Sequence, residues 1–178
     1  MHKDVERILI SEEEIRQRCK ELGKQITEDY QNESAPILVS ILKGSFPFMA
    51  EISKRIELDC EIEFMCVSSY AGTGTTGNVK IIMDLSRDIK DENILIVEDI
   101  VDTGVTLTKV RKLLMDRGAK SVRIVTLLDK KERRIMDIQP DYTAFDIPNE
   151  FVVGFGLDFN QKYRNLPFIG VLKEECYK

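Results

Sequence analysis

The sequence predicts an α/β domain with a doubly wound, mostly parallel sheet. Short apolar runs rich in β-branched residues, such as 37–42 and 94–97, indicate strands that are buried on both faces. A strand, a turn, a helix and a second strand follow one another over residues 93–128, which is typical of a βαβ unit. With 178 residues, 43% of them hydrophobic, the chain can bury one full core, and a single domain over residues 1–178 is expected. In such a sheet the ligands bind at the carboxyl ends of the strands.

The first third of the chain predicts two helices and a buried strand. A capping-box pattern starts at Ser11, and the apolar residues after it recur at helical spacing, so we expect a long amphipathic helix. A second helix is predicted to begin at Pro47, because proline fits the first position of a helix. The apolar residues of the first helix are Ile15, Cys19, Leu22, Ile26 and Tyr30, and those of the second segment are Phe48, Met49, Ile52 and Ile56.

The rest of the chain predicts further strands and one more helix. Apolar residues at helical spacing over 107–114 predict a helix that stops at Gly118, since glycine favours helix C-termini. The expected strands are Glu61 to Tyr70, Val79 to Leu85, Asn93 to Ile100 and Val122 to Leu128, with extended segments at Phe151 to Phe155 and Phe168 to Leu172.

The charge balance excludes several classes of protein. The formal net charge is −5 and the isoelectric point is near 5.1, whereas binding nucleic acid through bulk charge needs a basic surface. There is no apolar run of 18 residues, and the first 20 residues carry charges throughout, so neither a membrane span nor a signal peptide is expected. A cytoplasmic protein is the prediction.

The four cysteines give no sign of metal binding or disulfides. They form no CxxC pair, and the only histidine, His2, lies at a terminus that we expect to be frayed, so structural zinc and Cys–His catalysis are not expected. Cys60 and Cys66 fall in one predicted strand, roughly 20 Å apart, which is too far for a disulfide. All four thiols, including Cys19 and Cys176, are therefore expected to be reduced.

The most informative stretch is 97–106, where an apolar strand ends in three carboxylates and the chain turns into a helix. The turn has a glycine, two threonine hydroxyls and free amides at a helix N-terminus, which together favour a bound phosphate. Glu98 and Asp99, just before it, could accept hydrogen bonds from vicinal hydroxyls. The alternative interpretation is an ordinary helix cap at Asp102 or Thr103 after a solvated strand end.

This stretch resembles the phosphoribosyl pyrophosphate motif of the type I phosphoribosyltransferases. From about Ile37 to Leu172 the chain is similar to the hypoxanthine-guanine branch of that family. The resemblance implies the type I phosphoribosyltransferase fold, with a small hood built from the chain ends. Beyond the central motif it rests on Leu42-Lys43-Gly44, Ser69-Tyr70, Lys130 after Leu127-Leu128-Asp129, Phe151-Val152-Val153-Gly154, Asp158 and Arg164.

The resemblance implies a purine salvage enzyme. Such an enzyme transfers the 5-phosphoribosyl group from phosphoribosyl pyrophosphate to hypoxanthine or guanine, giving IMP or GMP and pyrophosphate. It is a pentosyltransferase that uses Mg²⁺, and its relatives are commonly dimers or tetramers, so a homodimer or homotetramer is expected. Its partners are these small molecules rather than nucleic acid or a membrane.

The resemblance also implies roles for individual residues on the sugar-phosphate side of the site. Glu98 and Asp99 are expected at the ribose hydroxyls and near the metal, and Asp102 is expected to act as general acid/base at the purine N7. The residues expected to hold the 5′-phosphate are Asp102, Thr103, Gly104, Val105 and Thr106.

Pyrophosphate and base contacts follow from the same resemblance. It places Lys43 and Gly44 at the pyrophosphate, beside a non-proline cis peptide bond. Arg164 is expected to be a second pyrophosphate contact, and Asp158 is expected to be a magnesium ligand. For the base, Phe151 is expected to stack on the purine, the Val152 backbone to meet its exocyclic edge, and Lys130 to donate to O6. Ser69 and Tyr70, at the start of a Gly/Thr-rich loop, are expected to be further substrate contacts.

The stretch Gly72-Thr73-Gly74-Thr75-Thr76-Gly77 also matches the GxGxxG pattern of dinucleotide-binding folds. That fingerprint requires a helix to begin at its end, whereas the residues from Val79 onward predict a strand. We therefore interpret 70–78 as a mobile lid between two antiparallel strands that excludes water from the reaction. The alternative is a hairpin tip without a role.

Two other functions are compatible with the fold. One is a regulator that senses nucleotide or phosphoribosyl pyrophosphate while binding RNA or DNA, and the other is a paralogue acting on xanthine, adenine or a pyrimidine. The acidic charge balance and the residues Lys130, Phe151 and Asp158 favour the enzyme over the regulator. Family members vary after Lys43-Gly44, before Leu157 and over 131–134, where this chain has Ser45-Phe46, Gly156 and Lys131-Glu132-Arg133-Arg134.

Overall fold

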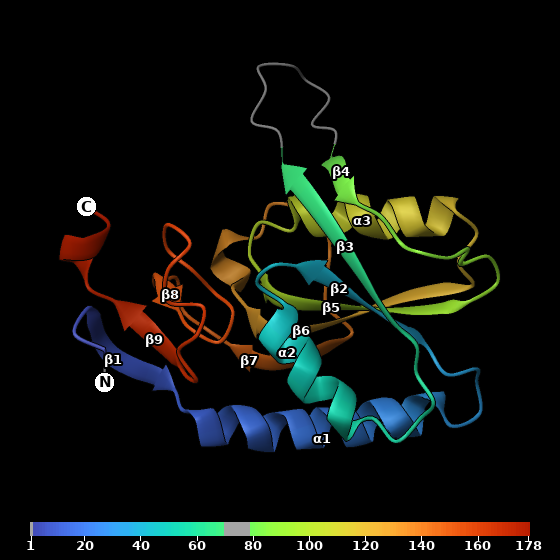
Figure 1. Cartoon of the computed structure of the whole chain (residues 1–178), viewed down its shortest axis with the longest axis horizontal. Helices are drawn as coiled ribbons and strands as arrows, with labels where there is room; N and C mark the ends of the chain where they lie inside the picture. The colour runs from blue at the N-terminus through green and yellow to red at the C-terminus, as the bar shows by residue number, and fades with distance from the viewer. Residues whose placement is uncertain (1, 70–78) are drawn as a thin grey trace.

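The computed structural model describes residues 2–69 and 79–178, and it has two layers of helices around a central sheet (Figure 1). The helices are α1 (Glu12–Tyr30), α2 (Phe46–Ile52) and α3 (Val105–Asp116), with short 3₁₀ helices η1 (Ser53–Arg55), η2 (Lys131–Arg133) and η3 (Glu174–Cys176). The strands are β1 (Val5–Ile10), β2 (Ile37–Leu42), β3 (Ile62–Ser69), β4 (Val79–Met83), β5 (Asn93–Val101), β6 (Ser121–Asp129), β7 (Tyr142–Asp146), β8 (Val152–Val153) and β9 (Ile169–Leu172).

The central sheet has six strands in the order β4-β3-β2-β5-β6-β7. The pairs from β3 to β7 are all parallel, and only the edge strand β4 is antiparallel to its neighbour. Helices α1 and α2 lie on one face of this sheet and α3 on the other (Figure 1). The predicted doubly wound, mostly parallel sheet is therefore confirmed.

The apolar run in β5 is continuous because both faces of this strand are buried. Leu95 and Val97 pack into the core beneath α1 and α2, whereas Ile94 and Ile96 pack into the core beneath α3. All four side chains are fully buried. Successive side chains of a strand point to opposite faces, so a strand between two helical layers needs apolar residues at every position.

The second sheet is the hood that the resemblance implies. It has three strands in the order β1-β9-β8, all antiparallel, and it joins the two ends of the chain. Val5 of β1, Val153 of β8 and Leu172 of β9 form a small core of their own. Figure 1 shows this sheet beside the central one, at the end where both termini lie.

Several details differ from the sequence-based expectations. Strands β1 and β7 were not predicted, and His2 is not frayed, since its ring packs edge-on against Tyr163 with the centroids 5.3 Å apart. Cys60 lies before β3 rather than within it, although all four cysteines are free as expected. Helix α2 begins at Phe46, with Pro47 in its first turn.

The GxGxxG stretch and the predicted lid fall in 70–78, outside the described residues. The segment that follows them is the strand β4, as expected, and not the helix that a dinucleotide fingerprint requires. No helix in the described ranges is long and apolar enough to span a membrane.

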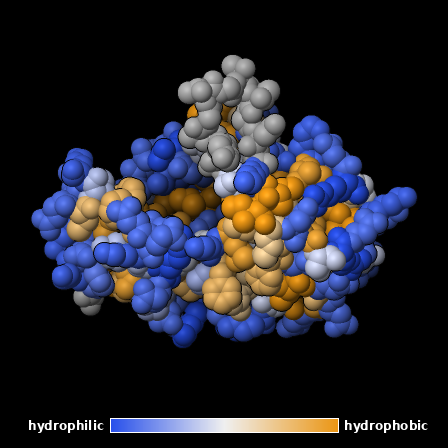
Figure 2. Space-filling model, turned by 45° about the horizontal axis from the view of Figure 1, so that its top comes forward, coloured by the Kyte–Doolittle hydropathy of each residue, from blue (hydrophilic) through white to orange (hydrophobic). Residues whose placement is uncertain are grey.

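The surface carries one large apolar area among mostly hydrophilic side chains (Figure 2). Large apolar side chains that the described residues expose include Ile62 of β3 and Ile82 and Met83 of β4. Phe46, at the start of α2, is 58% exposed. Contiguous exposed apolar patches mark contact surfaces more often than chance would give.

The N-terminus of α1 is closed by the predicted capping box. Ser11 Oγ accepts a hydrogen bond from the Glu14 amide at 3.3 Å, and the Glu14 carboxylate accepts one from the Ser11 amide at 2.8 Å. These contacts satisfy two amides that the helix itself leaves unpaired. The helix then buries its apolar face, from Ile15 to Tyr30, against the core.

The capping box predicts a measurable loss of stability when it is removed. Ser11→Ala is expected to lower the free energy of unfolding by about 0.5–2 kcal/mol, because the Glu14 amide loses its acceptor. Urea denaturation measures this difference. Ser11→Asp keeps an acceptor at the same position and is the matched control, so an equal loss in both variants would contradict the capping role.

Candidate active site

The carboxyl ends of three neighbouring strands carry most of the predicted site residues. Strand β2 ends before Lys43 and Gly44, β5 ends in the acidic stretch 98–102, and β6 ends before Lys130. Because these strands are parallel and adjacent, the three segments meet at one edge of the sheet. The hood supplies Asp158 and Arg164 from the loop between β8 and β9, and Phe151 and Val152 from the start of β8.

The turn after β5 is built to leave helix amides free. Gly104 is the residue before α3 and has a φ of 81°, a left-handed conformation that glycine adopts without strain. Gly104 has no side chain to cap α3, and the only side-chain acceptor near its first amides is Thr103 Oγ1, 3.5 Å from the Val105 amide, so the helix dipole favours an anion there. A cavity of about 220 Å³ lies at this turn and is lined by Ile41 and by residues 98–107.

Glu98 and Asp99 are adjacent, half-buried carboxyl groups near the end of β5. Burial raises the pKa of Glu98 well above its usual range, and the neighbouring Asp99 charge raises it further. Burial also raises the pKa of Asp99, although hydrogen bonds and the nearby charge of Arg164 act in the opposite direction. Two carboxyl groups in this environment favour binding of hydroxyl donors or a cation.

The backbone of Gly44 lies directly against the Asp99 carboxylate. A Cβ atom at position 44 would be 1.6 Å from Asp99 Oδ2, so any other residue there would displace that side chain. The peptide bond between Leu42 and Lys43 is cis, as the resemblance implies. The hood closes over this point, because a Cβ at Gly156 would be 1.9 Å from the Gly44 carbonyl oxygen.

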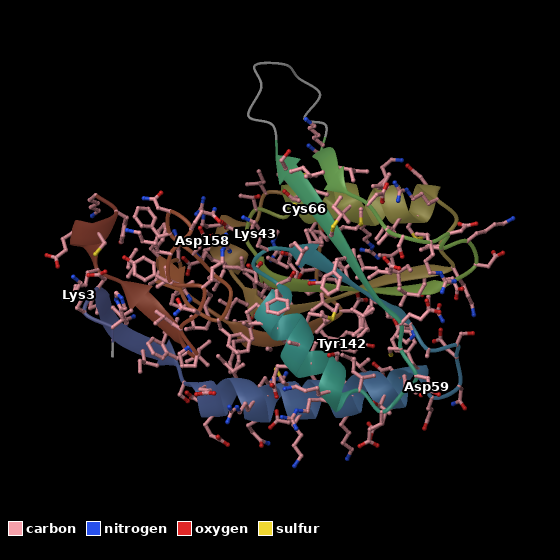
Figure 3. The ribbon with its side chains drawn as sticks, in the orientation of Figure 1. Lys3, Lys43, Asp59, Cys66, Tyr142 and Asp158 are labelled. Carbon is pink, nitrogen blue, oxygen red and sulfur yellow. The ribbon has the colours of Figure 1, made fainter. Side chains whose placement is uncertain are left out.

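Asp158 and Arg164 form an ion pair at the hood side of the site. Their Oδ1 and Nη2 atoms are 2.7 Å apart, and Arg164 also donates to the Gly156 carbonyl at 2.7 Å. Figure 3 shows Asp158 and Lys43 close together in projection, in agreement with the contact between Gly156 and Gly44. Arg164 is also near enough to Asp99 to lower the pKa of that carboxyl.

Lys130 is a buried cation on the other side of Asp102. It is 6% exposed, and its Nζ donates to the Glu150 carbonyl oxygen at 2.9 Å. Burial lowers the pKa of Lys130, while the nearby Asp102 carboxylate acts to raise it. A buried ammonium with one backbone partner keeps donors for a ligand, because an ammonium has three.

Asp102 lies between the buried Lys130 and the turn that leads into α3. Its side chain is about one third exposed, but its Oδ1 atom is buried and accepts no hydrogen bond from the described residues. The Arg133 Nε atom is 3.3 Å from this oxygen, close enough for an ion pair but without hydrogen-bond geometry. A carboxylate oxygen in this state is ready to accept a proton or a donor from a ligand.

Phe151 presents an aromatic ring at the edge of the hood, and it follows Glu150, whose carbonyl binds Lys130. One face of the ring stacks on Tyr177, with the centroids 4.7 Å apart and the planes 18° from parallel. Phe159 packs against it edge-on at 5.6 Å. Phe151 remains 37% exposed, which leaves ring surface for a planar ligand.

The remaining predicted residues are placed less fully. Val152 is buried in β8, where it pairs with Val171, and Ser69 is the last residue of β3. Tyr70 is outside the described residues. The sequence did not predict the contacts of Glu150, Arg134 and Tyr177. These residues lie in no motif and at no regular spacing that would distinguish them from surface residues.

Oxygen ligands for a divalent cation come from both sides of this edge. In the described part of the chain no three His, Cys, Asp or Glu side chains gather closely enough to hold a metal alone. Glu98 and Asp99 on β5 line the cavity, and Asp158 in the hood loop is connected to them through Arg164, which pairs with Asp158 and lies near Asp99. This donor set fits Mg²⁺, which commonly takes one or two carboxylates and completes its shell with phosphate oxygens and water.

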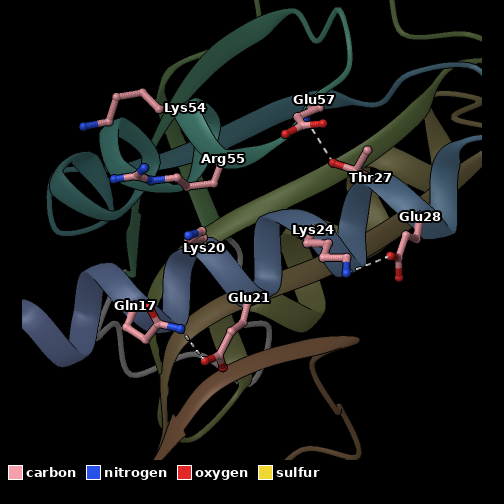
Figure 4. Close-up of a pocket in the computed structure, with 9 residues that line it drawn as sticks. All are labelled: Gln17, Lys20, Glu21, Lys24, Thr27, Glu28, Lys54, Arg55 and Glu57. Carbon is pink, nitrogen blue, oxygen red and sulfur yellow. Dashed lines mark hydrogen bonds and ion pairs between the residues drawn. The ribbon is translucent and has the colours of Figure 1, made fainter.

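A larger cavity, of about 510 Å³, lies between α1 and η1 and contains none of the predicted site residues (Figure 4). Its charged groups largely pair with one another, as Lys24 does with Glu28 at 3.7 Å and Lys54 with Glu51 at 2.7 Å. Lys and Glu alternate along its wall, so it offers no concentrated charge to an ionic ligand. The candidate site is therefore the smaller cavity at the strand ends.

Known proteins share this fold and most of this sequence. Residues 6–160 match the family model of the phosphoribosyl transferase domain. The hypoxanthine-guanine phosphoribosyltransferase of Streptococcus pneumoniae (strain ATCC BAA-255 / R6) is 53% identical over 178 residues, covering 99% of this chain and 98% of that protein. The enzyme of the same name from Lactococcus lactis subsp. lactis (strain IL1403) is 54% identical, covering 99% and 96%.

Solved structures agree with the sequence comparison. A hypoxanthine phosphoribosyltransferase from Staphylococcus aureus has a TM-score of 0.95 and 51% identity, covering 100% of this chain and 97% of that one. The Trypanosoma cruzi enzyme in complex with the product IMP has a TM-score of 0.94 and 40% identity, with 99% of each chain covered. This chain belongs to the phosphoribosyltransferase family, in its hypoxanthine-guanine branch.

Proposed function

We infer that this chain is a purine salvage enzyme. It transfers the 5-phosphoribosyl group from phosphoribosyl pyrophosphate to hypoxanthine or guanine, giving IMP or GMP and pyrophosphate. The observation that carries this conclusion is the position of Asp102. Its Oδ1 atom accepts no hydrogen bond from the described residues, and the residue lies between the turn at the start of α3 and the buried Lys130.

The reaction needs a purine nitrogen to displace pyrophosphate from the anomeric carbon, and the ribose becomes cationic as the leaving group departs. We assign the 5′-phosphate to the amides and hydroxyls of 103–106, and the ribose hydroxyls to Glu98 and Asp99. The protein binds the phosphate on one side of Asp102 and the base on the other, so both reactants are held next to each other. The reaction between them is then effectively unimolecular.

The leaving pyrophosphate is assigned to the groups at the hood side. Lys43, the Gly44 backbone and Arg164 supply positive charge or donors there, and positioned charge of this kind stabilises a departing anion. Asp102 is assigned the purine proton, which it takes from or returns to N7. Lys130 donates to the oxygen at position 6, and Phe151 stacks on the purine ring.

Mg²⁺ is proposed as the cofactor. Asp158 would hold it directly, and Glu98 and Asp99 would contact it through ribose hydroxyls or directly. When bound, the ion neutralises charge on the pyrophosphate. The position of two adjacent, half-buried carboxyl groups in the cavity supports this proposal, since a nearby cation stabilises their ionised forms.

The remaining proposals concern assembly and location. We expect a homodimer or homotetramer, and the exposed apolar side chains on β3, β4 and at Phe46 support self-association. A study of the Trypanosoma cruzi enzyme concerns the role of its C-terminal region in oligomeric state. A cytoplasmic location stays a prediction.

A base panel separates this function from the alternatives. The purified protein is incubated with Mg²⁺, phosphoribosyl pyrophosphate and each of hypoxanthine, guanine, xanthine, adenine and uracil, and nucleotide formation is followed. Turnover of hypoxanthine and guanine is expected. Turnover restricted to another base would indicate a paralogue, and ligand binding without turnover of any base would indicate a regulator.

Asp102→Asn is expected to lower turnover by roughly 10²–10⁴-fold, the range for general acid–base groups, because the amide cannot exchange the purine proton. The KM values for both substrates should remain close to those of the wild type, since the turn keeps its backbone. Single-turnover kinetics, which isolate the chemical step, provide the measurement. An unchanged rate of that step would remove the assignment.

Asp158→Asn is expected to raise the Mg²⁺ concentration that gives half-maximal rate, because an amide oxygen is a weaker ligand than a carboxylate. A magnesium titration at saturating substrates measures the change. Asp146→Asn, which breaks an exposed ion pair with Lys131 outside the site, is the matched control. If the titrations of the two variants coincide, Asp158 does not bind the ion.

Lys130→Ala is expected to lose most of the kcat/KM with hypoxanthine and guanine. The ratio of kcat/KM for these bases to kcat/KM for adenine is expected to fall. The Lys130 ammonium donates to a carbonyl at position 6 of the purine. Adenine carries an amine at that position, and two donors cannot form a hydrogen bond with each other. Values of kcat/KM for the three bases test this. The neighbouring Lys131 is exposed and pairs with Asp146, so Lys131→Ala is the control. An unchanged ratio of 6-oxopurine to adenine in Lys130→Ala would refute the role.

A further inference from the structure

The segment after Lys130 carries two arginines to which the function above gives no role. Arg133 is half exposed and pairs with the Asp102 side chain. Arg134 is different, because its side chain is 10% exposed and forms an ion pair with Asp129, which is 1% exposed. A buried ion pair of this kind is costly to desolvate, so the contacts that it makes need an explanation.

The guanidinium of Arg134 is bonded to the backbone that leads into the active-site turn. Its Nε donates to the Asp102 carbonyl oxygen at 2.9 Å, and its Nη2 lies 3.4 Å from the Val101 carbonyl oxygen. It also donates to the Ile138 carbonyl and to Asp129 Oδ1. Only an arginine has a planar fork of donors that can reach acceptors in several directions at once.

The main chain next to Arg134 holds the following residue of the turn. The amides of Ile135 and Met136 both donate to the Thr103 carbonyl oxygen, at 3.1 and 3.2 Å. Gly104 is packed against the same segment, since a Cβ there would be 2.6 Å from Ile138 Cγ2 and 3.1 Å from Arg134 Cδ. The carbonyl oxygens of residues 101, 102 and 103 thus all accept hydrogen bonds from the segment 134–136.

These contacts matter because the Asp102 side chain has few partners of its own. Its Oδ1 accepts no hydrogen bond from the described residues and has only the half-exposed Arg133 Nε nearby, at 3.3 Å, and the one side-chain contact at the start of α3 is the long bond from the Val105 amide to Thr103 Oγ1, at 3.5 Å. The direction of the carboxylate and of the free amides therefore follows from the course of the backbone over 101–104. That course depends on the segment 134–138, and Asp129 orients its guanidinium.

We propose that Arg134, oriented by Asp129, is a positioning residue that holds the Asp102 turn in its catalytic geometry. The proposal rests on the proposed function, in which this turn carries the proton-transfer group and the 5′-phosphate site. Arg134 acts through the backbone from outside the cavity and touches neither substrate. Displacing a catalytic group by about 1 Å lowers rates by about 10²-fold, so a looser turn has a large effect on turnover.

The variant that separates positioning from mere stability is the double substitution Asp129→Leu/Arg134→Met. Replacing both members of a buried ion pair by apolar residues of similar size is often neutral for stability or improves it. The fold should therefore survive while the bonds to carbonyls 101, 102 and 138 are lost. Thermal unfolding and the far-UV circular dichroism spectrum establish that the variant is folded.

The expected result is a split between the kinetic constants. In the double variant kcat should fall roughly 10–100-fold and the KM for phosphoribosyl pyrophosphate should rise, with the KM for hypoxanthine unchanged. Arg134→Lys, which keeps the charge but not the fork, should show the same split to a smaller extent. A residue that only stabilises the fold would change the unfolding temperature and leave the rate per folded molecule unaltered.

Two further variants complete the test. Lys131→Gln, in the same segment but in an exposed ion pair, should have wild-type constants. Asp102→Asn reports on the proposed function itself, independently of Arg134. If Asp102→Asn loses turnover while folded Asp129→Leu/Arg134→Met or Arg134→Lys keeps wild-type kcat and KM values, the positioning role is overturned and the site assignment stands. If Asp102→Asn keeps full turnover, the site assignment itself has failed, and with it the ground for the proposal.

Discussion

The site depends on two neighbouring, half-buried carboxyl groups at the end of one strand. Glu98 and Asp99 follow the four fully buried residues 94–97, in the middle of the sheet, and line the cavity at the strand ends. The surrounding protein removes part of their water, so ionising both groups there is unfavourable, and the pKa of each is raised. A site with this requirement selects ligands that bring hydroxyl donors and positive charge.

That constraint explains why the surrounding loops are so closely packed. The main chain of Gly44 touches the Asp99 carboxylate of β5, and the main chain of Gly156 touches the Gly44 carbonyl oxygen, so three segments from distant parts of the sequence are in close contact. Each glycine is needed because a Cβ would overlap an oxygen atom. Arg164 then reaches the same space from the hood and supplies the charge that offsets part of the burial of Asp99.

Much of this arrangement could be predicted from the sequence, and the exceptions have physical reasons. Strands β2, β5 and β6 and helix α1 carry strong periodic patterns, and the motif at 97–106 located the turn. Strand β1 was missed because its sequence, Val-Glu-Arg-Ile-Leu-Ile, has charged residues where an exposed hood strand faces solvent. Strand β7 was missed because five residues at the edge of a sheet give a weak pattern.

Side-chain partnerships were harder to foresee than elements. Nothing in the sequence distinguishes Arg134 from the exposed Arg133 beside it, since burial depends on how 134–138 folds back onto the β5 turn. The stacking of Tyr177 on Phe151 likewise joins two residues that are neighbours only after β8 and β9 have paired. Contacts of this kind are set by tertiary structure, which local patterns do not encode.

The hood gives distant parts of the chain a shared role beside the site. Its sheet pairs Val5 with Leu172, so β9 lies between β1 and β8 and holds both of them. The turn at Gly104 follows a strand of the central sheet, whereas Phe151, Asp158 and Arg164 lie next to or between the hood strands. The two sides of the candidate site therefore rest on two sheets that are hydrogen-bonded separately. Loss of the pairs between β1 and β9 would loosen the side that carries Phe151 and leave the strands behind the Gly104 turn paired.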